Sequence, residues 1–378
     1  SSYYNSGLFD DPSAVDFLGE KLEADDGDFL EVINELYKTK TGFRYNFADI
    51  PADIFGSIYE QYLGQIQQEH ESDKKKSKRK SQGIYYTPRY IVDYIVQNTL
   101  GEVLKTKTPD EIKNLKILDP ACGSGSFLIT AYSKLIEHWQ KEKFNKHHFK
   151  EGKLADLEKE FKKRANFELS SQNKQRILLD NIYGVDLDDE AVELAKLNLL
   201  SKTVGRRAKL PNIDHNIAVG NSLIDDSKIS DKAFDWQKSF PEVFKKGGFD
   251  VIIGNPPYVR VDSLNKNDKE YWKTVFKTPK GKYDLYYLFV EKSIELLNNG
   301  GKLGFIIPNK FSVASSAKKL RELIVHSSTT CEFISVSKLK IFGDASNYPI
   351  LLILTKGSDL KKVKIKSFYS EGDFLKNN

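Results

Sequence analysis

The four residues Asn255-Pro256-Pro257-Tyr258 have the types and spacing needed to bind a planar amino group and make it reactive. Two consecutive prolines fix the backbone φ angle and remove two N–H donors, so the carbonyl groups of Asn255 and Pro256 are held rigidly. The side-chain oxygen of Asn255 and the backbone oxygen of Pro256 can accept hydrogen bonds from both N–H groups of an exocyclic NH2 group. The nitrogen lone pair is then less committed to its ring, and Tyr258 offers a flat face for the base.

The preceding stretch predicts where this tetrapeptide lies. Residues 249–254 form a short apolar run that ends abruptly, which is typical of a buried strand in a parallel sheet. Open α/β sheets bind ligands at the carboxyl ends of such strands. A proline-rich turn without chemistry is the simpler interpretation for Pro-Pro alone. The full tetrapeptide directly after a strand favours a catalytic loop.

A second candidate site is the glycine-rich turn within residues 117–127, which follows another apolar run. Asp119 ends the predicted strand, where a carboxylate makes charge-assisted hydrogen bonds to a hydroxyl or ammonium group. Gly123 and Gly125 allow the backbone to approach a ligand closely. A phosphate-binding loop does not fit because no Lys-Ser or Lys-Thr follows, and a dinucleotide fingerprint would need a third glycine. A purely structural tight turn is the alternative.

Two further strands lead to polar residues. Asp186 ends the run 182–186, which is where nucleoside-binding α/β sheets place the acid that binds ribose hydroxyls, and Asp188 is expected to cap the next helix. After residues 217–219, Asn221 is placed to hydrogen-bond an adenine edge, and Ser222 is a further cofactor-binding candidate. A plain turn is the alternative there.

Thr87 and Pro88 precede apolar residues at helical spacing between 91 and 96. Thr87 is expected to cap this helix and Pro88 to occupy its first position. By itself this is only a well-made helix start, and its place upstream of the glycine-rich turn gives it weight as part of a site.

Length and composition set limits on the protein class. With 378 residues the chain has room for a full α/β domain and a second element. No apolar run approaches the roughly 20 residues of a membrane span, and two distant cysteines predict neither a disulfide framework nor a metal site, so a cytoplasmic protein is expected. The net charge of +5 is compatible with a polyanion or with an ordinary surface.

Three regions are expected along the chain. Residues 1–80 show helical spacing and end in a basic run, which is typical either of phosphate contact or of a solvated linker. Residues 81–357 alternate strands and helices, with a charged helical insertion at about 140–180. Residues 358–378 are interpreted as the start of a linker. The absence of Met, even at position 1, favours a fragment of a larger protein.

In their order along the chain, these motifs resemble those of the gamma-class DNA amino-methyltransferases, and more narrowly the methyltransferase region of type IIG restriction–modification enzymes. The resemblance covers about residues 50 to 370. It implies a DNA adenine-N6 methyltransferase, dependent on S-adenosylmethionine, with a Rossmann-like seven-stranded sheet. It assigns the cofactor's methionine end to Thr87, Pro88, Asp119, Ala121 and Gly123, its ribose to Asp186 and its adenine to Asn221. No metal is expected.

The chain also departs from the family pattern. Many relatives have Asp at the position of Asn221. Relatives often carry a second aromatic residue after the fifth strand to sandwich the flipped base with Tyr258, and Phe311 is the nearest candidate here. An upstream nuclease and a downstream target-recognition domain are expected in the parent chain, with double-stranded DNA as partner.

Two other functions stay open. A protein-glutamine or RNA amino-methyltransferase could use the same loop for another planar amine. A non-catalytic DNA-binding or specificity module could retain the fold. The intact cofactor turn and catalytic loop favour an enzyme.

Overall fold

The computed structural model describes residues 87–148, 169–203, 210–339, 341, 348–358 and 360–376. The predictions for residues 1–80 and for the segment 83–86 lie outside the described residues. So does most of the charged insertion, since residues 149–168 are not described. Within the described part, helix α7 (Ser126–His148) enters that insertion and helix α9 (Ser171–Asn181) leaves it.

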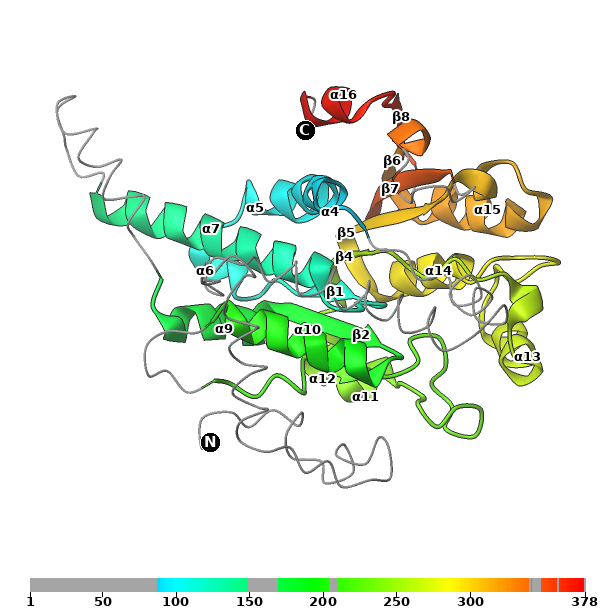
Figure 1. The fold of residues 1–378 in the computed structure, drawn as a ribbon, viewed down its shortest axis with the longest axis horizontal. Coiled ribbons are helices and arrows are strands. Elements are labelled where there is room, and N and C mark those ends of the chain that lie inside the picture. Colours follow the sequence, from blue (N-terminus) through cyan, green and yellow to red (C-terminus); the bar gives the residue numbers. More distant parts are fainter. Residues whose placement is uncertain are drawn as a thin grey trace, which may run out of the picture.

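A single eight-stranded sheet forms the centre of the fold, in the order β3-β2-β1-β4-β5-β7-β6-β8 (Figure 1). The first five strands in this order are parallel, β7 runs antiparallel to both β5 and β6, and β8 is parallel to β6. The predicted α/β fold is therefore confirmed, with one strand more than the seven expected. The strands are β1 Ile117–Asp119, β2 Ile182–Asp186, β3 Ile217–Val219, β4 Phe249–Gly254, β5 Leu297–Pro308, β6 Ser328–Ser335, β7 Pro349–Lys356 and β8 Lys362–Ser367.

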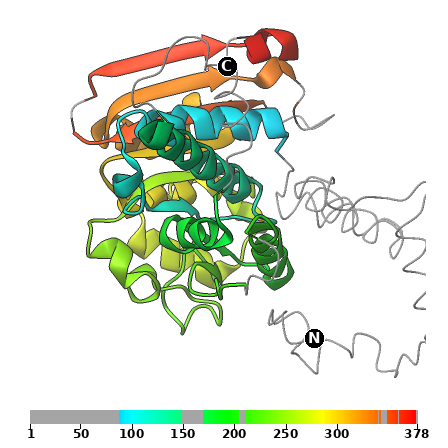
Figure 2. The ribbon, with the colours of Figure 1, turned by 90° about the vertical axis from the view of Figure 1, so that its left-hand side faces the viewer.

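The additional strand lies in the stretch 358–378, which the sequence predicts as the start of a linker. Strand β8 pairs with β6 along six residues at the outer edge of the sheet (Figure 2). Helix α16 (Glu371–Lys376) follows and buries Phe374 completely, with its ring 4.8 Å from that of Tyr94. The linker prediction is thus wrong for this stretch, because pairing with β6 and burial of Phe368 and Phe374 hold it against the domain. The alternation of Lys with Val and Ile at 362–366 was the missed strand signal.

Helices cover both faces of the sheet. Alternate residues of the central strands enter different buried clusters, since Val251 and Ile253 pack with one and Ile252 with the other. The first cluster contains residues of α4 (Arg89–Val96), α7, α9 and α10 (Asp189–Ser201), and the second contains residues of α14 (Tyr286–Leu296) and α15 (Lys318–His326). Further helices are α5 (Glu102–Leu104), α6 (Pro109–Ile112), α11 (Trp236–Ser239), α12 (Pro241–Phe244) and α13 (Lys266–Val275), and a π-helical turn spans Gln97–Gly101.

The predicted helix starts differ in outcome. The Asp188 carboxylate accepts hydrogen bonds from the N–H groups of Glu190 and Ala191, so its capping role is confirmed. At α4 the N-cap position is Pro88 and the helix begins at Arg89, without a side-chain capping bond. The capping role predicted for Thr87 is therefore wrong.

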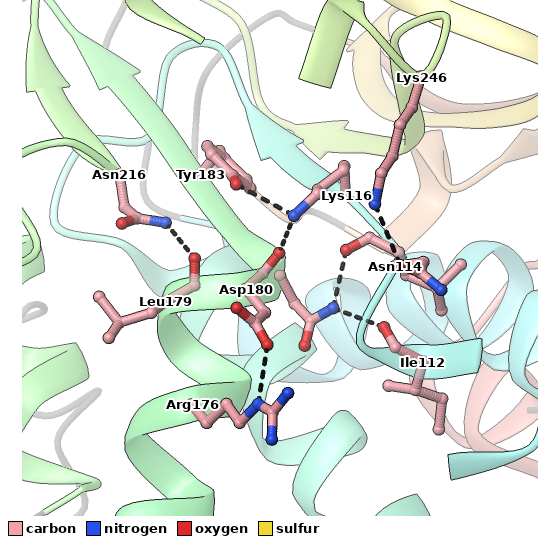
Figure 3. Close-up of polar contacts among 11 residues, drawn as sticks. Ile112, Asn114, Lys116, Arg176, Leu179, Asp180, Tyr183, Asn216 and Lys246 are labelled. Carbon is pink, nitrogen blue, oxygen red and sulfur yellow. Dashed lines mark hydrogen bonds and ion pairs between the residues drawn. The ribbon is translucent and has the colours of Figure 1, made fainter. Parts of the chain in front are cut away.

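Polar side chains tie together the amino-terminal ends of β1 and β2 (Figure 3). The buried side chain of Asn181 donates from Nδ2 to the carbonyl oxygen of Ile112 at 2.6 Å. The Lys116 ammonium group donates to the carbonyl oxygen of Asp180 and to the hydroxyl of Tyr183, and its burial lowers its pKa. This network holds together the amino-terminal ends of these strands, which lie opposite the carboxyl ends where the site is predicted.

Candidate active site

The predicted cofactor turn lies at the carboxyl end of β1, between that strand and α7. Gly123 and Gly125 have φ angles of +50° and +89°, which explains the glycines because other residues rarely adopt them. A Cβ atom on Gly123 would have no atom within 4 Å, so the turn faces open space at that position. A Cβ on Gly125 would lie 3.1 Å from that of Ala195, so this glycine lets the turn pack against α10.

Asp119 is the central buried charge of the site, with 1% of its surface exposed. Its Oδ1 atom accepts a hydrogen bond of 3.0 Å from the N–H of Ala121. Burial holds the pKa of Asp119 well above its usual range, and the negative charge of Asp186 raises it further, against the effect of the Ala121 hydrogen bond. Two acids thus lie close together, and no cationic side chain among the described residues is found beside them. This arrangement suits a positively charged ligand group.

Asp186 links the ends of β1 and β2. Its Oδ2 atom accepts from the N–H of Gly123 at 2.8 Å, and its Oδ1 atom accepts from the N–H of Asp188 at 3.0 Å. Burial raises the pKa of Asp186, and these two hydrogen bonds oppose the shift. Each carboxylate oxygen has a second lone pair, so the group can also accept hydrogen bonds from a ligand's hydroxyls.

The predicted catalytic loop starts directly at the end of β4, beside β1. Asn255 donates from Nδ2 to the hydroxyl oxygen of Thr87 at 3.0 Å, which joins the loop to the start of α4. Gly254 lets the loop pass close to the cofactor turn, because a Cβ there would lie 2.6 Å from Oδ1 of Asp119. Pro256 is buried and Pro257 is half-buried. The two predicted parts of the site are therefore in contact.

Tyr258 is half-buried and held at two points. Its hydroxyl donates to the carbonyl oxygen of Ile306 in β5 at 3.0 Å. Its ring meets that of Tyr286 edge to face, with ring centroids 6.2 Å apart. The position and orientation of the Tyr258 ring are thus fixed from β5 and α14.

Three predicted site residues make contacts within the protein. Phe311 is 2% exposed and packs beside Phe333 in the core, so it presents no face for stacking a base. The Ser222 hydroxyl donates to the carbonyl oxygen of Pro120 at 2.6 Å and thereby braces the cofactor turn. Oδ1 of Asn221 accepts from the N–H of Leu223 at 3.1 Å within its own turn.

Sequence reasoning missed the structural parts played by Gly254, Asp284 and Tyr286. Asp284 and Tyr286 belong to the aromatic-rich run 283–289, which was not predicted to be part of the site. Burial raises the pKa of Asp284, while the positive charges of Lys310 and Arg260 oppose the shift. The run Tyr-Asp-Leu-Tyr-Tyr was a usable signal. Aromatic residues on both sides of an acid indicate that the acid is partly buried, and charged residues are uncommon in buried positions.

A cavity of about 530 Å³ lies between α4 and α7. Its lining comes from Thr87, from α4 and the start of the π-helical turn that follows it, from α7, and from Lys202 and Leu375. The cavity therefore adjoins the site without containing the catalytic loop. Within the described ranges no three His, Cys, Asp or Glu side chains are grouped closely enough to hold a metal ion. No described helix is long and apolar enough to cross a membrane.

Comparison with known families identifies the domain. Residues 180–342 match the Eco57I restriction-modification methylase family, and residues 106–223 match the RMKL-like methyltransferase domain family. Residues 180–342 therefore belong to an Eco57I-type restriction-modification methylase domain. The Eco57I-type match begins before β2 and extends beyond β6, so it includes Asp186 and the whole catalytic loop.

Among its relatives, the Eco57I-type domain is similar to the type II restriction enzyme and methyltransferase RM.Eco57I of Escherichia coli. The two are 32% identical over an alignment that covers 99% of this chain and 37% of that protein. The adenine-specific methyltransferase PglX of Streptomyces coelicolor is 24% identical, with 82% of this chain and 26% of that protein covered. This chain thus spans well under half the length of these relatives. The first similarity confirms the predicted resemblance to restriction–modification methyltransferases, and the second is to an adenine-specific methyltransferase.

Solved structures show the same fold as the Eco57I-type domain. The type ISP restriction-modification enzyme LlaBIII bound to DNA has a TM-score of 0.59 at 17% identity, with 96% of this chain and 24% of that chain covered. The DrdV–DNA complex has a TM-score of 0.57 at 16% identity, with 86% and 31% covered. At these identities the likeness establishes the fold alone, and it agrees with the predicted α/β architecture.

Proposed function

We propose that this domain transfers a methyl group from S-adenosylmethionine to the N6 amine of an adenine flipped out of double-stranded DNA. The observation that supports this most directly is the contact between the two candidate sites. The Asn255–Tyr258 loop leaves β4 beside the buried Asp119 and is bonded to Thr87. An acceptor array for an amine therefore adjoins a pair of acids suited to a cationic cofactor.

The residues at the carboxyl ends of β1 to β3 fit the cofactor. Asp119 would receive its ammonium group, because a buried carboxylate gains most from a cationic partner. The open turn at Gly123 would admit its methionine part, and Asp186 would accept the ribose hydroxyls. Asn221 would lie near its adenine. When bound, S-adenosylmethionine supplies an electrophilic methyl group on a cationic sulfur.

The chain's own residues position the target amine. A base inside a duplex cannot reach a pocket of this kind, so the adenine must be flipped out. The side-chain oxygen of Asn255 and the carbonyl oxygen of Pro256 would accept hydrogen bonds from its two amine protons, and Tyr258 would hold the plane of the base. As the new N–C bond replaces the methyl–sulfur bond of the cofactor, one amine proton would leave to solvent. Asn255 has no titratable group, so it orients and polarises the amine rather than acting as a base.

The proposal includes a larger parent protein. This chain covers 37% of RM.Eco57I, whose name combines a restriction enzyme with a methyltransferase. We infer that the parent chain carries a nuclease and a target-recognition part, and that the methylase serves a restriction–modification system.

The test is a labelled-methyl transfer assay on genomic DNA from a strain without DNA methylation, because the recognition sequence is unknown. Label is expected in N6-methyladenine after digestion of the DNA to nucleosides. RNA and a glutamine-containing protein serve as parallel substrates. Label on cytosine, on RNA alone or on protein alone would contradict the proposal.

A further inference from the structure

Three loops meet around Tyr258 at the carboxyl end of the sheet. The backbone after Tyr258 is paired with the start of α14, since the N–H of Val261 donates to the carbonyl of Tyr283 at 3.0 Å, and that of Leu285 to Val259 at 2.7 Å. The Tyr286 hydroxyl donates at 3.4 Å to the carbonyl of Pro308, at the end of β5. The segments 258–261, 283–286 and 308–310 therefore form one connected border beside the proposed base site.

This border and the adjacent Lys282 carry exposed cations. Arg260 and Asp284 face each other as partners of an isolated antiparallel bridge. The side chains of Arg260 and Lys282 are 62% and 77% exposed, and Lys310 is exposed as well. Arg260 and Lys310 lie close enough to Asp284 for their charges to oppose the rise in its pKa. The cations thus lie on the solvent side of the same loops that hold Tyr258.

The basic character of this region is concentrated. Residues 260–282 contain seven lysines and arginines against three acids, a difference of +4, whereas the whole chain carries +5. Asp262 is 3.6 Å from Arg260 and 4.0 Å from Lys282, and all three side chains are more than half exposed. Exposed ion pairs of this length contribute little free energy, so both cations can exchange Asp262 for another anion at small cost.

We propose that Arg260, Lys282 and Lys310 form a cationic rim that binds the DNA backbone phosphates on either side of the flipped base. The inference rests on the proposed function, because the base must enter beside Tyr258 and its neighbouring phosphates must then pass the rim. Phosphate contacts by Arg and Lys fix the register of the duplex without reading its sequence. The rim accordingly supplies salt-dependent affinity and positions the target strand at the catalytic loop.

The test compares two triple variants of the full chain with the wild-type protein. Arg260→Gln, Lys282→Gln and Lys310→Gln remove the rim charges. The control variant carries Lys105→Gln, Lys113→Gln and Lys245→Gln, which also remove three charges. These lysines are exposed and precede β1 or β4, so they lie toward the amino-terminal ends of the strands, away from the rim. Binding to a fluorescent duplex is measured between about 50 and 200 mM salt, where each lost phosphate contact reduces the slope of log K against log salt by about 0.9.

The rim variant is expected to show a slope smaller by about 2 to 3 and a KM for DNA raised at least tenfold, with kcat at saturating DNA within a few-fold of the wild-type value. The control variant is expected to change the slope by less than 1. Arg260→Lys, Lys282→Arg and Lys310→Arg together should restore the wild-type slope, because they retain the charges. Equal slopes for the rim variant and the control variant would overturn the proposal.

The two proposals fail in different ways. If the wild-type protein transfers no methyl group to adenine but the rim variant still loses slope, the proposed function is wrong and the rim stands as a phosphate-binding surface. If methylation proceeds and the slope is unchanged, only the rim is wrong. A larger loss of slope for RNA of the same sequence than for the duplex would assign the surface to RNA and overturn the proposal for DNA.

Discussion

Thr87 and Asn255, which are 168 positions apart in the sequence, are joined side chain to side chain by a hydrogen bond of 3.0 Å. Asn255 is the donor, so the bond fixes the orientation of its amide group. The side-chain oxygen of Asn255 then points away from Thr87. The start of α4 is therefore a support for the catalytic loop. We therefore propose that Thr87 helps to position the target amine, in addition to its expected contact with the cofactor.

Replacing Thr87 tests this support. Thr87→Val removes the hydroxyl and keeps the shape, and we expect methyl transfer to slow roughly 2- to 10-fold, as for loss of one hydrogen bond of about 0.5–1.5 kcal/mol. Thr87→Ser keeps the hydroxyl and should retain most of the rate. Single-turnover rates at saturating cofactor and DNA separate this effect from binding. Equal rates for the Val and Ser variants would show that the bond does not matter for turnover.

Asn255→Ala should lower methyl transfer by about 10²-fold or more, because a preorganised acceptor is removed from the amine. The affinity for S-adenosylmethionine, measured by calorimetry, is expected to stay within a few-fold. Asn299→Ala makes the same chemical change at an exposed position and is the matched control. Near-normal turnover of the Asn255 variant would remove this residue from the catalytic assignment.

Cofactor affinity should depend on the protonation of Asp119. Because the pKa of Asp119 is raised well above its ordinary value, the group is protonated at a pH where a free carboxyl is ionised. Only the carboxylate pairs well with an ammonium group, so affinity should rise as the pH rises through the raised pKa, with proton release on binding below it. Titration calorimetry in two buffers of different ionisation enthalpy measures the released protons.

The same pKa shift has an opposite effect on the stability of the cofactor-free protein. Between 3.8, the pKa of an Asp side chain in the unfolded chain, and the raised pKa of Asp119, the folded state binds more protons than the unfolded state. The free energy of unfolding must therefore fall as the pH rises through this window. Asp119→Asn should flatten both pH profiles. A variant that keeps the wild-type pH dependence of cofactor binding would assign that dependence to another group, with Asp186 as the next candidate because its pKa is raised too.

Gly254→Ala should disturb the two parts of the site together. The new Cβ atom would lie 2.6 Å from Oδ1 of Asp119, closer than such atoms approach, so β4 or the Asp119 carboxylate must shift. We expect a loss of about 1–3 kcal/mol in the free energy of unfolding, and weaker cofactor binding. Gly372→Ala, where a Cβ would meet nothing within 4 Å, is the control. Unchanged cofactor affinity and stability in the Gly254 variant would contradict the close packing described here.

The catalytic loop and the cofactor turn could be predicted from the sequence because their signals are local. The apolar run before Asn255 has the length of a buried strand, and the two prolines fix the following backbone wherever the strand lies. The glycines of the cofactor turn signal positive φ angles in the same way, as found at Gly123 and Gly125. Backbone restrictions of this kind depend on the residue itself and hardly on the rest of the chain.

The partners of these residues were decided only by the tertiary structure. Phe311 has the right residue type for a stacking partner, but its turn after β5 directs it into the core beside Phe333. Thr87 resembles a helix cap, yet its hydroxyl is bonded to Asn255, and the stretch interpreted as a linker forms β8 and α16. Such outcomes depend on which distant segment occupies the adjacent space. Burial and hydrogen-bond satisfaction are properties of the assembled fold, whereas periodicity and backbone restriction are properties of the sequence.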